Sequence, residues 1–281
     1  MSTDRKGFAD ISKTILITGS TDGIGLATAE MLLEQNHKVL LHGRNGEKLK
    51  SLKEKLATKF GPQKVKAYLA DLTLSSDVET LVKEVRADHK SLDVLINNAG
   101  VFKTSSISTP YGLDTRFVVN TIAPYFLTKQ LLSLLPVDGR IINLSSAAQA
   151  PVEIEALLGK RQLSNSAAYA QSKLALTIWS QNLAGDLAPG SPSIFSVNPA
   201  SMLGSKMVKQ AYGVDGADLR IGADILTRAA LSDEFNQAAG KYYDNDRKAF
   251  ASPHPDASNP EKVSSIMAGL SEALKIYTTA D

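Results

Sequence analysis

The feature of the sequence that most restricts the local fold is a set of three closely spaced glycines near the start of the chain: Gly19, Gly23 and Gly25. They follow residues 13–18, an apolar run rich in β-branched residues that predicts a strand buried on both faces. They lead into residues 24–36, where apolar residues at helical spacing predict a helix. Glycines allow a tight turn and a close approach of the backbone, and a helix N-terminus offers free N–H groups. The segment therefore predicts a phosphate-binding turn, and a tight strand–helix turn without a ligand is the alternative.

Further apolar runs alternate with helical patterns along the chain, which predicts an α/β fold with a parallel sheet. We expect strands at residues 38–42, 65–70, 92–96, 139–144, 193–197 and, as the last strand, 240–243. Helices are expected at residues 47–60, 75–89, 112–135, 166–187, 226–231 and 260–277. Ser75 and Ser76 are expected to cap the third helix, and Pro124 is expected to kink the long fourth one. Because there is no repeat or linker, residues 1–281 are predicted to form a single domain.

The composition excludes several classes of function. The 281 residues include no cysteine, which rules out disulfides, thiolate catalysis and cysteine-ligated metals. The four histidines have no ligand-like spacing, so no metal site is expected. A net charge of +2 without a basic run gives no support for nucleic-acid binding. The polar residues 1–12 do not resemble a signal peptide, and no apolar run approaches the roughly 18–20 residues of a membrane helix, so we expect a cytoplasmic protein without a membrane partner.

The second predicted strand ends in Gly43 and Arg44, and the nearest acid is Glu47. An NAD site usually places an acid there to bind the ribose 2′-hydroxyl, whereas an arginine can bind a 2′-phosphate through two parallel hydrogen bonds. The sequence therefore favours NADP(H) over NAD(H). The alternative is that Arg44 is an exposed loop residue.

Tyr169 and Lys173 stand four residues apart in the helix predicted to begin near Ser166, so their side chains share one face. A phenol has a pKa near ~10, too high for proton exchange at neutral pH, and a nearby ammonium lowers it. Such a tyrosine can give a proton to a carbonyl oxygen or take one from an alcohol. The alternative is a chance pairing on an amphipathic helix.

Polar residues also stand at three other places in or after apolar segments. Asn-Asn-Ala-Gly at residues 97–100 follows the fourth strand, and Asn120 interrupts an apolar helix, where a buried amide needs partners. Ser145 and Ser146 follow the fifth strand, at the sheet edge where ligands bind in open α/β folds. The alternative for residues 97–100 is an ordinary polar turn, and for Asn120 it is a local hydrogen bond. For either serine the alternative is a helix cap.

The glycine turn of the form Thr-Gly-x-x-x-Gly-x-Gly, the Asn-Asn-Ala-Gly motif and the Tyr-x-x-x-Lys pair together resemble the classical short-chain dehydrogenase/reductase family. The resemblance covers almost the whole chain. It implies a Rossmann-type, doubly wound α/β sandwich with a central parallel β-sheet flanked by helices on both faces.

The same resemblance implies a catalytic tetrad. Tyr169 would be the general acid/base and Ser146 would hydrogen-bond the substrate carbonyl. Lys173 would bind the nicotinamide ribose and lower the pKa of Tyr169, and Asn120 would connect Lys173 to solvent through a water. The family's serine lies three residues after an asparagine of the strand, which selects Ser146; Ser145 is the second choice.

The resemblance also implies a cofactor site, in which an aspartate after the third strand lies against the adenine. The residues expected to bind the cofactor are Gly19, Ser20, Thr21, Asp22, Gly23, Ile24, Gly25, Arg44, Asp71, Leu72, Asn98, Ala99, Gly100, Tyr169, Lys173, Pro199 and Ser205. Two positions depart from the family pattern. Ala200 stands where the family has the glycine of a Pro-Gly dipeptide, and Ser205 is only the nearest residue to a threonine that contacts the nicotinamide amide.

The substrate segments resemble the retinol-dehydrogenase-like branch of the family, which shares the long spacing between Ser146 and Tyr169 and the segment 240–243. Residues 151–165 are expected to flank the substrate pocket, and residues 201–225 are expected to form a mobile lid. Apolar side chains in these segments favour a hydrophobic aldehyde, ketone or alcohol: Val152, Leu157, Met202, Leu203 and Met207.

The function expected from these features is that of an NADP(H)-dependent carbonyl reductase or alcohol dehydrogenase for a small apolar substrate. The resemblance implies a homodimer or homotetramer built on the helices of Asn120 and Tyr169. The main alternative is a non-catalytic NADP(H)-binding sensor or scaffold with the same fold. A sugar-nucleotide epimerase is a third possibility, but its longer chain and different glycine spacing do not fit.

Overall fold

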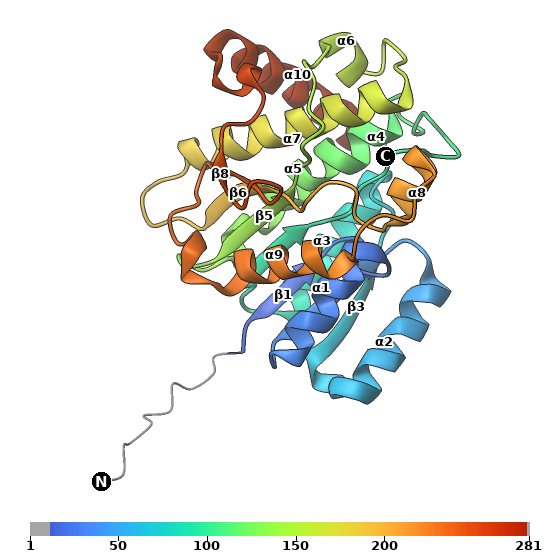
Figure 1. Cartoon of the computed structure of the whole chain (residues 1–281), viewed down its shortest axis with the longest axis vertical. Coiled ribbons are helices and arrows are strands. Elements are labelled where there is room, and N and C mark those ends of the chain that lie inside the picture. The colour runs from blue at the N-terminus through green and yellow to red at the C-terminus, as the bar shows by residue number, and fades with distance from the viewer. Residues whose placement is uncertain (1–11, 280–281) are drawn as a thin grey trace.

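All strands found in residues 12–279, the part of the chain that this computed structural model describes, belong to one sheet (Figure 1). Its order is β3-β2-β1-β4-β5-β6-β7-β8. The bounds are β1 Thr14–Ile17, β2 Lys38–Gly43, β3 Val65–Leu69, β4 Val94–Asn97, β5 Arg140–Leu144, β6 Ser193–Asn198, β7 Tyr242–Asp244 and β8 Ala249–Ala251. β1 to β7 pair in parallel, as predicted, and β8 is antiparallel to β7. The order reverses between β1 and β4, which is where open sheets of this kind bind dinucleotides.

Helices cover both faces of this sheet, so the predicted doubly wound fold class is confirmed. One face carries α1 (Gly23–Glu34), α2 (Gly46–Phe60) and α9 (Leu219–Leu231), below the sheet in Figure 1. The other carries α3 (Ser75–Asp88), α5 (Ala123–Leu131), α7 (Asn165–Asp186) and α10 (Pro260–Thr278). Three shorter helices are α4 (Thr115–Phe117), α6 (Ile154–Leu157) and α8 (Lys206–Tyr212). The polar lead-in predicted over 1–12 lies almost entirely outside the described residues.

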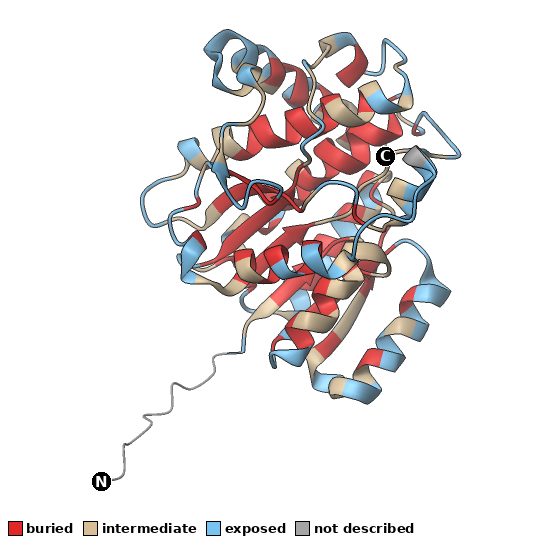
Figure 2. Ribbon diagram, viewed as in Figure 1, coloured by how far each residue is buried: buried red, intermediate tan, exposed pale blue. Residues whose placement is uncertain are grey.

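The central strands are buried on both sides, which accounts for their continuous apolar sequences (Figure 2). In β1, Leu16 packs into the core beneath α3, α5 and α7, whereas Ile15 and Ile17 pack into the core beneath α1, α2 and α9. All three side chains are fully buried. Burial of an aliphatic side chain of this size contributes about 1.5–3 kcal/mol, so each strand is held from both faces.

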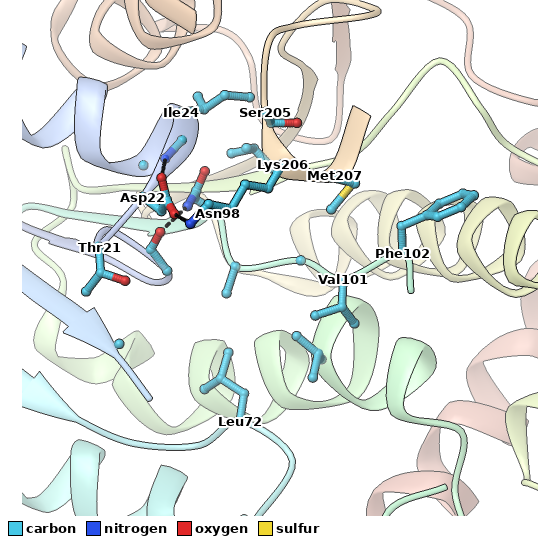
Figure 3. Close-up of a pocket in the computed structure, with 18 of the residues that line it drawn as sticks. Thr21, Asp22, Ile24, Leu72, Asn98, Val101, Phe102, Ser205, Lys206 and Met207 are labelled. Atoms are coloured by element: carbon cyan, nitrogen blue, oxygen red, sulfur yellow. Dashed lines mark hydrogen bonds and ion pairs between the residues drawn. The ribbon is translucent and has the colours of Figure 1, made fainter. Parts of the chain in front are cut away.

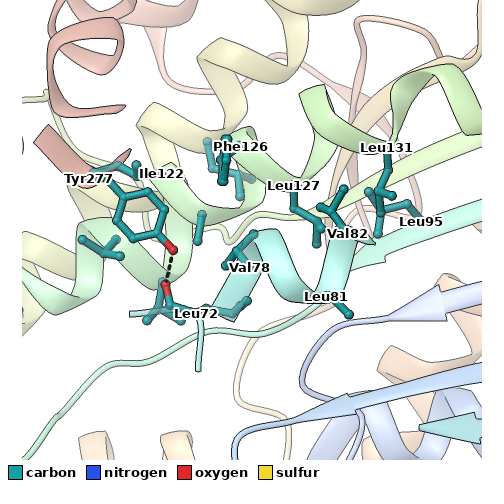
Figure 4. Close-up of a cluster of buried hydrophobic side chains, with 14 of the residues drawn as sticks. Leu72, Val78, Leu81, Val82, Leu95, Ile122, Phe126, Leu127, Leu131 and Tyr277 are labelled. Carbon is teal, nitrogen blue, oxygen red and sulfur yellow. Dashed lines mark hydrogen bonds between the residues drawn. The ribbon is translucent and has the colours of Figure 1, made fainter. Parts of the chain in front are cut away.

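The C-terminal helix α10 closes one of these cores and reaches the loop after β3. The Tyr277 hydroxyl donates a hydrogen bond of 3.0 Å to the Leu72 carbonyl oxygen (Figure 4). The Tyr277 ring packs edge-on against Tyr111 and Phe126. α10 therefore fixes the position of a loop that, as described below, forms a wall of the main cavity.

The long helix predicted over residues 112–135 begins later and is not uniform. It starts with α4 at Thr115 and widens into a π-turn over Val118–Ile122, before α5 continues it. At the end of that turn the Ala123 N–H donates to a carbonyl five residues back rather than four. Pro124, which has no N–H to donate, is the second residue of α5 and directly follows the wider turn.

The serine cap predicted for α3 is wrong. Leu74 occupies the N-cap position and no side chain caps the helix there. Asp77, in the first turn, instead accepts a hydrogen bond of 2.8 Å from the backbone N–H of Asp71. The start of α3 is thus tied to the loop after β3 rather than capped by its own serines.

The segment 240–243 is not the last strand, because β8 follows it and forms a hairpin with β7. Three residues, Ala-Phe-Ala, make up β8. So short a run in a polar surrounding has no detectable alternation, and its pairing with β7 is what makes it a strand.

The turn after β6 is strained at Ala200, where the family pattern has glycine. Ala200 has a φ of 116°, in a region that side chains rarely allow. Hydrogen bonds on both sides hold the turn. The Asn198 amide donates to Asp244 and Asp246, at 2.9 Å each, and Ser201 donates to Asp246 through its N–H and its hydroxyl. The hairpin of β7 and β8 therefore imposes the conformation that alanine tolerates poorly.

Replacement of this alanine should stabilise the protein. Ala200→Gly relieves about 1–3 kcal/mol of backbone strain and adds up to about 1 kcal/mol of unfolded-state entropy. The net rise in the free energy of unfolding should be about 1 kcal/mol, measured by urea denaturation. Ala188→Gly, at an exposed loop position without a positive φ, is the control and should destabilise slightly. An equal decrease in the free energy of unfolding in both variants would contradict the assignment of strain to Ala200.

Candidate active site

A cavity of about 520 Å³ opens at the C-terminal edge of the sheet, beside the glycine turn (Figure 3). Its volume lies within the range of small-molecule sites, roughly 300–1,000 Å³. With one exception, every residue predicted to bind the cofactor lines it. The exception is Ser20, which is fully buried and whose hydroxyl accepts a hydrogen bond from the backbone N–H of His42.

The glycine turn interlocks with the Asn-Asn-Ala-Gly segment. The Asn98 amide donates to the carbonyl oxygens of Thr18 and Gly19, at 2.8 and 3.1 Å. A Cβ on Gly25 would lie 2.4 Å from that amide nitrogen, so only glycine fits. Gly19 has a φ of 65°, and a Cβ there would lie 2.8 Å from the Cα of Ala99. The two motifs thus form one structural unit around the cavity.

His42, at the end of β2, also holds the glycine turn, a role that the sequence analysis missed. Its Nδ1 accepts a hydrogen bond of 3.0 Å from the Gly19 N–H. Burial lowers the pKa of His42 to about 4, which keeps the ring neutral and Nδ1 available as an acceptor. The only sign of this role in the sequence is a histidine just before Gly43, and a single histidine at the end of a strand does not indicate which backbone group it binds.

Asp22, in the glycine turn, is paired with two lysines that the sequence analysis did not include. Its carboxylate lies 2.9 Å from the Lys48 ammonium. The same carboxylate lies 2.5 Å from the Lys206 ammonium (Figure 3). Partial burial raises the pKa of Asp22, but hydrogen bonds from Lys206, Lys48 and the Gly23 N–H outweigh it and lower the pKa to about 2. All three charged side chains line the cavity.

Tyr169 and Lys173 share a face of α7, as predicted, and both line the cavity. The Lys173 ammonium lies 5.7 Å from the centre of the Tyr169 ring and donates a hydrogen bond of 2.6 Å to the Leu144 carbonyl oxygen. Burial lowers the pKa of Lys173 to about 8. On its other side, the Tyr169 ring contacts Phe102 at 5.4 Å between ring centres.

Asn120 is fully buried in the π-turn and does not line the cavity. Its carboxamide accepts from the Val101 N–H at 2.8 Å and donates to the Val101 carbonyl and the Ser172 hydroxyl. A Cβ on Gly100 would lie 3.4 Å from the Asn120 oxygen and 3.6 Å from the Lys173 nitrogen. Asn120 and Lys173 therefore converge on the same point of the backbone.

The two serines after β5 differ in their surroundings. The Ser145 hydroxyl is buried and lies 2.6 Å from the Thr177 hydroxyl of α7. The Ser146 hydroxyl accepts a hydrogen bond of 3.1 Å from the Ala148 N–H, and Ser146 lines a second cavity of about 370 Å³ next to Tyr169. Both serines line the second cavity beside Tyr169, and they differ in that the Ser145 hydroxyl is already paired with Thr177.

The segment 151–165 does not flank either cavity, contrary to expectation. Its apolar side chains pack into the core instead. Leu157 is fully buried, and Ile154 lies against Gly269 of α10. The predicted lid, 201–225, includes α8 and the start of α9. Residues from Leu219 onward belong to the helix that packs on α1, whereas Met202, Leu203 and Met207 line the second cavity.

Comparison with known proteins agrees with this geometry. The family described as short chain dehydrogenase matches residues 13–213. The chain belongs to the short-chain dehydrogenase family. It is 27% identical to mouse (Mus musculus) retinol dehydrogenase 13 over 268 residues, 89% of this chain and 80% of that protein. It is 32% identical to human (Homo sapiens) retinol dehydrogenase 11 over 194 residues, 68% of this chain and 61% of that protein.

A solved structure of a short chain dehydrogenase from Shigella flexneri, complexed with NADP, has 25% identity and a TM-score of 0.65, with 83% of this chain and 97% of that chain covered. The predicted family, its retinol-dehydrogenase-like branch and the class of enzyme are thus confirmed. This short-chain dehydrogenase is an NAD(P)-dependent oxidoreductase that acts on CH–OH and C=O groups. No helix among residues 12–279 is long and apolar enough to cross a membrane.

The residues around the main cavity fit a nicotinamide dinucleotide. The backbone is bare at Gly23, where an added Cβ would meet no atom within 4 Å. Gly100 also lines the cavity, and an added Cβ there would meet its nearest atom at 3.4 Å, an ordinary contact distance. Arg44, Lys48 and Lys206 place positive charge on the same wall. A ligand with phosphate groups at one end and a ring near Tyr169 matches both features.

The buried His42 should make stability depend on pH. Between its folded-state pKa of about 4 and the ordinary value near 6.5, the unfolded chain binds a proton that the folded chain does not. The free energy of unfolding should therefore decrease as the pH falls, by about 1.6 kcal/mol between pH 6.5 and 5 from this group alone. His42→Asn, which keeps an acceptor near the position of Nδ1, should show a correspondingly shallower loss in denaturation measured across this range. Parallel pH profiles for the two proteins would refute the effect.

Proposed function

We propose that this short-chain dehydrogenase transfers hydride between NADP(H) and a small apolar carbonyl or alcohol substrate. The observation that carries the proposal is the position of Tyr169, which lines both the main cavity and the adjoining one. NADP(H) supplies or accepts the hydride. The side chains derived below handle the proton and the substrate oxygen.

Tyr169 is the proposed general acid/base. In reduction its hydroxyl gives a proton to the substrate oxygen, and in oxidation it takes one from the alcohol. The nearby Lys173 ammonium favours the phenolate and so makes the exchange easier near neutral pH. Ser146 is proposed to hydrogen-bond the same oxygen, because it lines the second cavity beside Tyr169. Ser145 lines that cavity too, but its hydroxyl lies 2.6 Å from the Thr177 hydroxyl of α7.

Asn120 is proposed to complete the tetrad by connecting Lys173 to solvent through a water. The contacts of its side chain add a positioning role. By bonding both backbone groups of Val101 it fixes the wall that faces Lys173. Asn120 lies in the π-turn, and its amide meets that wall through these bonds.

The preference for NADP(H) over NAD(H) rests on Arg44. The residue is exposed at the end of β2 and lines the main cavity. No hydrogen bond or ion pair joins Arg44 to another of residues 12–279, so its guanidinium is available for a phosphate. We propose that it binds the 2′-phosphate, with the other predicted cofactor residues that line the cavity around the rest of the molecule.

The second cavity supports an apolar substrate. Phe102, Met202, Leu203, Met207 and Val208 line it together with Ser146 and Tyr169. Retinol, which the relatives' names give as their substrate, is an apolar alcohol of this kind. We propose residues 201–218 as the lid over this cavity, because α9 packs on α1 beyond that point.

A single domain over residues 1–281, a cytoplasmic location and a homodimer or homotetramer stay predictions from the sequence. α10 packs on α7 through Ile266, which contacts Leu174 and Ile178. A subunit interface on the Tyr169 helix would therefore include α10.

Removal of the Tyr169 hydroxyl should abolish most turnover. Tyr169→Phe should lower turnover of an apolar aldehyde or ketone by about 10²–10⁴-fold, because general acid/base catalysis contributes that much. The affinity of this variant for NADPH, measured by fluorescence titration, should stay within about twofold of the wild-type value. Tyr125→Phe, at a ring that packs on Trp179 away from both cavities, is the control. Near-normal turnover by Tyr169→Phe would exclude this role. If the wild-type protein binds NADPH but reduces none of a panel of carbonyl compounds, the result would favour the alternative function, a non-catalytic NADP(H)-binding sensor or scaffold.

Charge reversal at Arg44 should shift the cofactor preference. Arg44→Asp replaces the proposed 2′-phosphate contact with a group suited to a ribose 2′-hydroxyl. The ratio of NADPH to NADH affinity should fall by at least about tenfold. Lys50→Asp, an exposed change on α2 outside the cavity, should leave the ratio unchanged. An unaltered ratio in Arg44→Asp would contradict the contact.

A further inference from the structure

An acid in a phosphate-binding turn requires an explanation. Asp22 lines the main cavity and lies at the N-terminus of α1, where cofactor phosphates are expected. A carboxylate there repels an anionic ligand. Its pKa of about 2 means that it is charged at any working pH. The site must therefore offset this charge.

The cap of α1 accounts for only one of the two carboxylate oxygens of Asp22. One of its oxygens accepts a hydrogen bond of 2.9 Å from the Gly23 N–H, a bond that asparagine, serine or threonine can also accept at an N-cap. The other oxygen binds the ammonium groups of Lys48 and Lys206. Those two lysines come from different parts of the chain, α2 and α8, and meet at one carboxylate atom.

The two lysines reverse the sign of the charge at this wall. Arg44, Lys48, Lys206 and Asp22 all line the cavity, and the charges of these four side chains sum to +2. Lys206 keeps a largely exposed side chain, and Lys48 is half-exposed, so both ammonium groups have donors left for a ligand. A phosphate monoester, with a charge near −2 at neutral pH, matches this wall.

We propose that Lys48 and Lys206 are further ligands of the cofactor 2′-phosphate, and that Asp22 is the residue that positions them. The proposal rests on the proposed function, because it assumes NADP(H) in the main cavity. It also makes α8 part of the cofactor site, since Lys206 is the first residue of that helix.

The location favours the 2′-phosphate over the pyrophosphate. Lys48 lies in the first turn of α2, where its N–H donates to the cap residue Asn45, next to Arg44. The end of β2 touches the glycine turn directly, because a Cβ on Gly43 would lie 2.6 Å from the methyl group of Thr21. Arg44 and the Asp22 cluster are therefore neighbours across that contact.

The test measures the affinities of NADPH, NADH, 2′,5′-ADP and 5′-AMP for the full-length wild type and single variants. Lys48→Gln and Lys206→Gln should each weaken NADPH and 2′,5′-ADP by about tenfold or more, with changes under about twofold for NADH and 5′-AMP. Lys50→Gln on α2 and Lys209→Gln on α8 are the matched controls. Neither lines the cavity, and Lys209 pairs with Asp215 instead.

The role of Asp22 is tested by a double-mutant cycle. Asp22→Asn keeps an acceptor for the cap but removes the charge that holds the lysines. If Asp22 positions Lys206, then Lys206→Gln should weaken NADPH less in the Asp22→Asn background than in the wild type. Equal losses in both backgrounds would overturn the positioning role.

The outcomes separate this inference from the proposed function. Equal weakening of NADPH and NADH in a lysine variant would assign that lysine to the pyrophosphate and overturn the inference. Unchanged affinities with normal NADPH-dependent turnover would also overturn it, while leaving the proposed function in place. Selective loss of 2′,5′-ADP binding in a protein without carbonyl turnover would support the inference and contradict the proposed function.

Discussion

The site depends first on the contact between Asn98 and the glycine turn. The Asn98 amide donates to two carbonyl groups of the turn and occupies the space that Gly25 leaves open. This joins the ends of β1 and β4, between which the strand order reverses. His42 supports the same turn from β2. The part of the cavity around the glycine turn is thus built from backbone held by three adjacent strands.

A second constraint is the burial of the Lys173 ammonium. Burial alone lowers its pKa toward neutrality, so the structure must hold the group charged if it is to favour the Tyr169 phenolate. The carbonyl oxygen of Leu144, at the end of β5, accepts one of its protons. Asn120 fixes the facing wall at Gly100 and Val101. The proton-transfer chemistry therefore relies on strand ends and on a π-turn as much as on the Tyr-x-x-x-Lys pair.

The strands, most helices and the residues around the main cavity could be predicted from local sequence. Each of these features follows from a short pattern of residues that has a single physical explanation. The glycine turn and the spacing of Tyr169 and Lys173 are of this kind. The partners of Asp22 could not be predicted, because Lys206 is 184 positions away from it. The role of His42 depended on a hydrogen bond across two strands. The segment 151–165 was expected at the substrate pocket but packs into the core, because the same apolar side chains suit a pocket wall and a core equally well.

Three contacts made by the C-terminal third of the chain help to complete the site. The hairpin of β7 and β8 strains the turn at Ala200, α10 fixes the loop at Leu72, and α8 delivers Lys206. Several hydrogen bonds hold the turn at Ala200, and the bond between Tyr277 and Leu72 is buried. The contact of Lys206 with Asp22 is an exposed ion pair, which contributes little to stability. The wall formed by α8 is therefore the part of the cavity that is held least firmly by the protein itself. A bound phosphate would add bonds where the chain alone has fewest, so cofactor binding and the position of the lid should be coupled through α8.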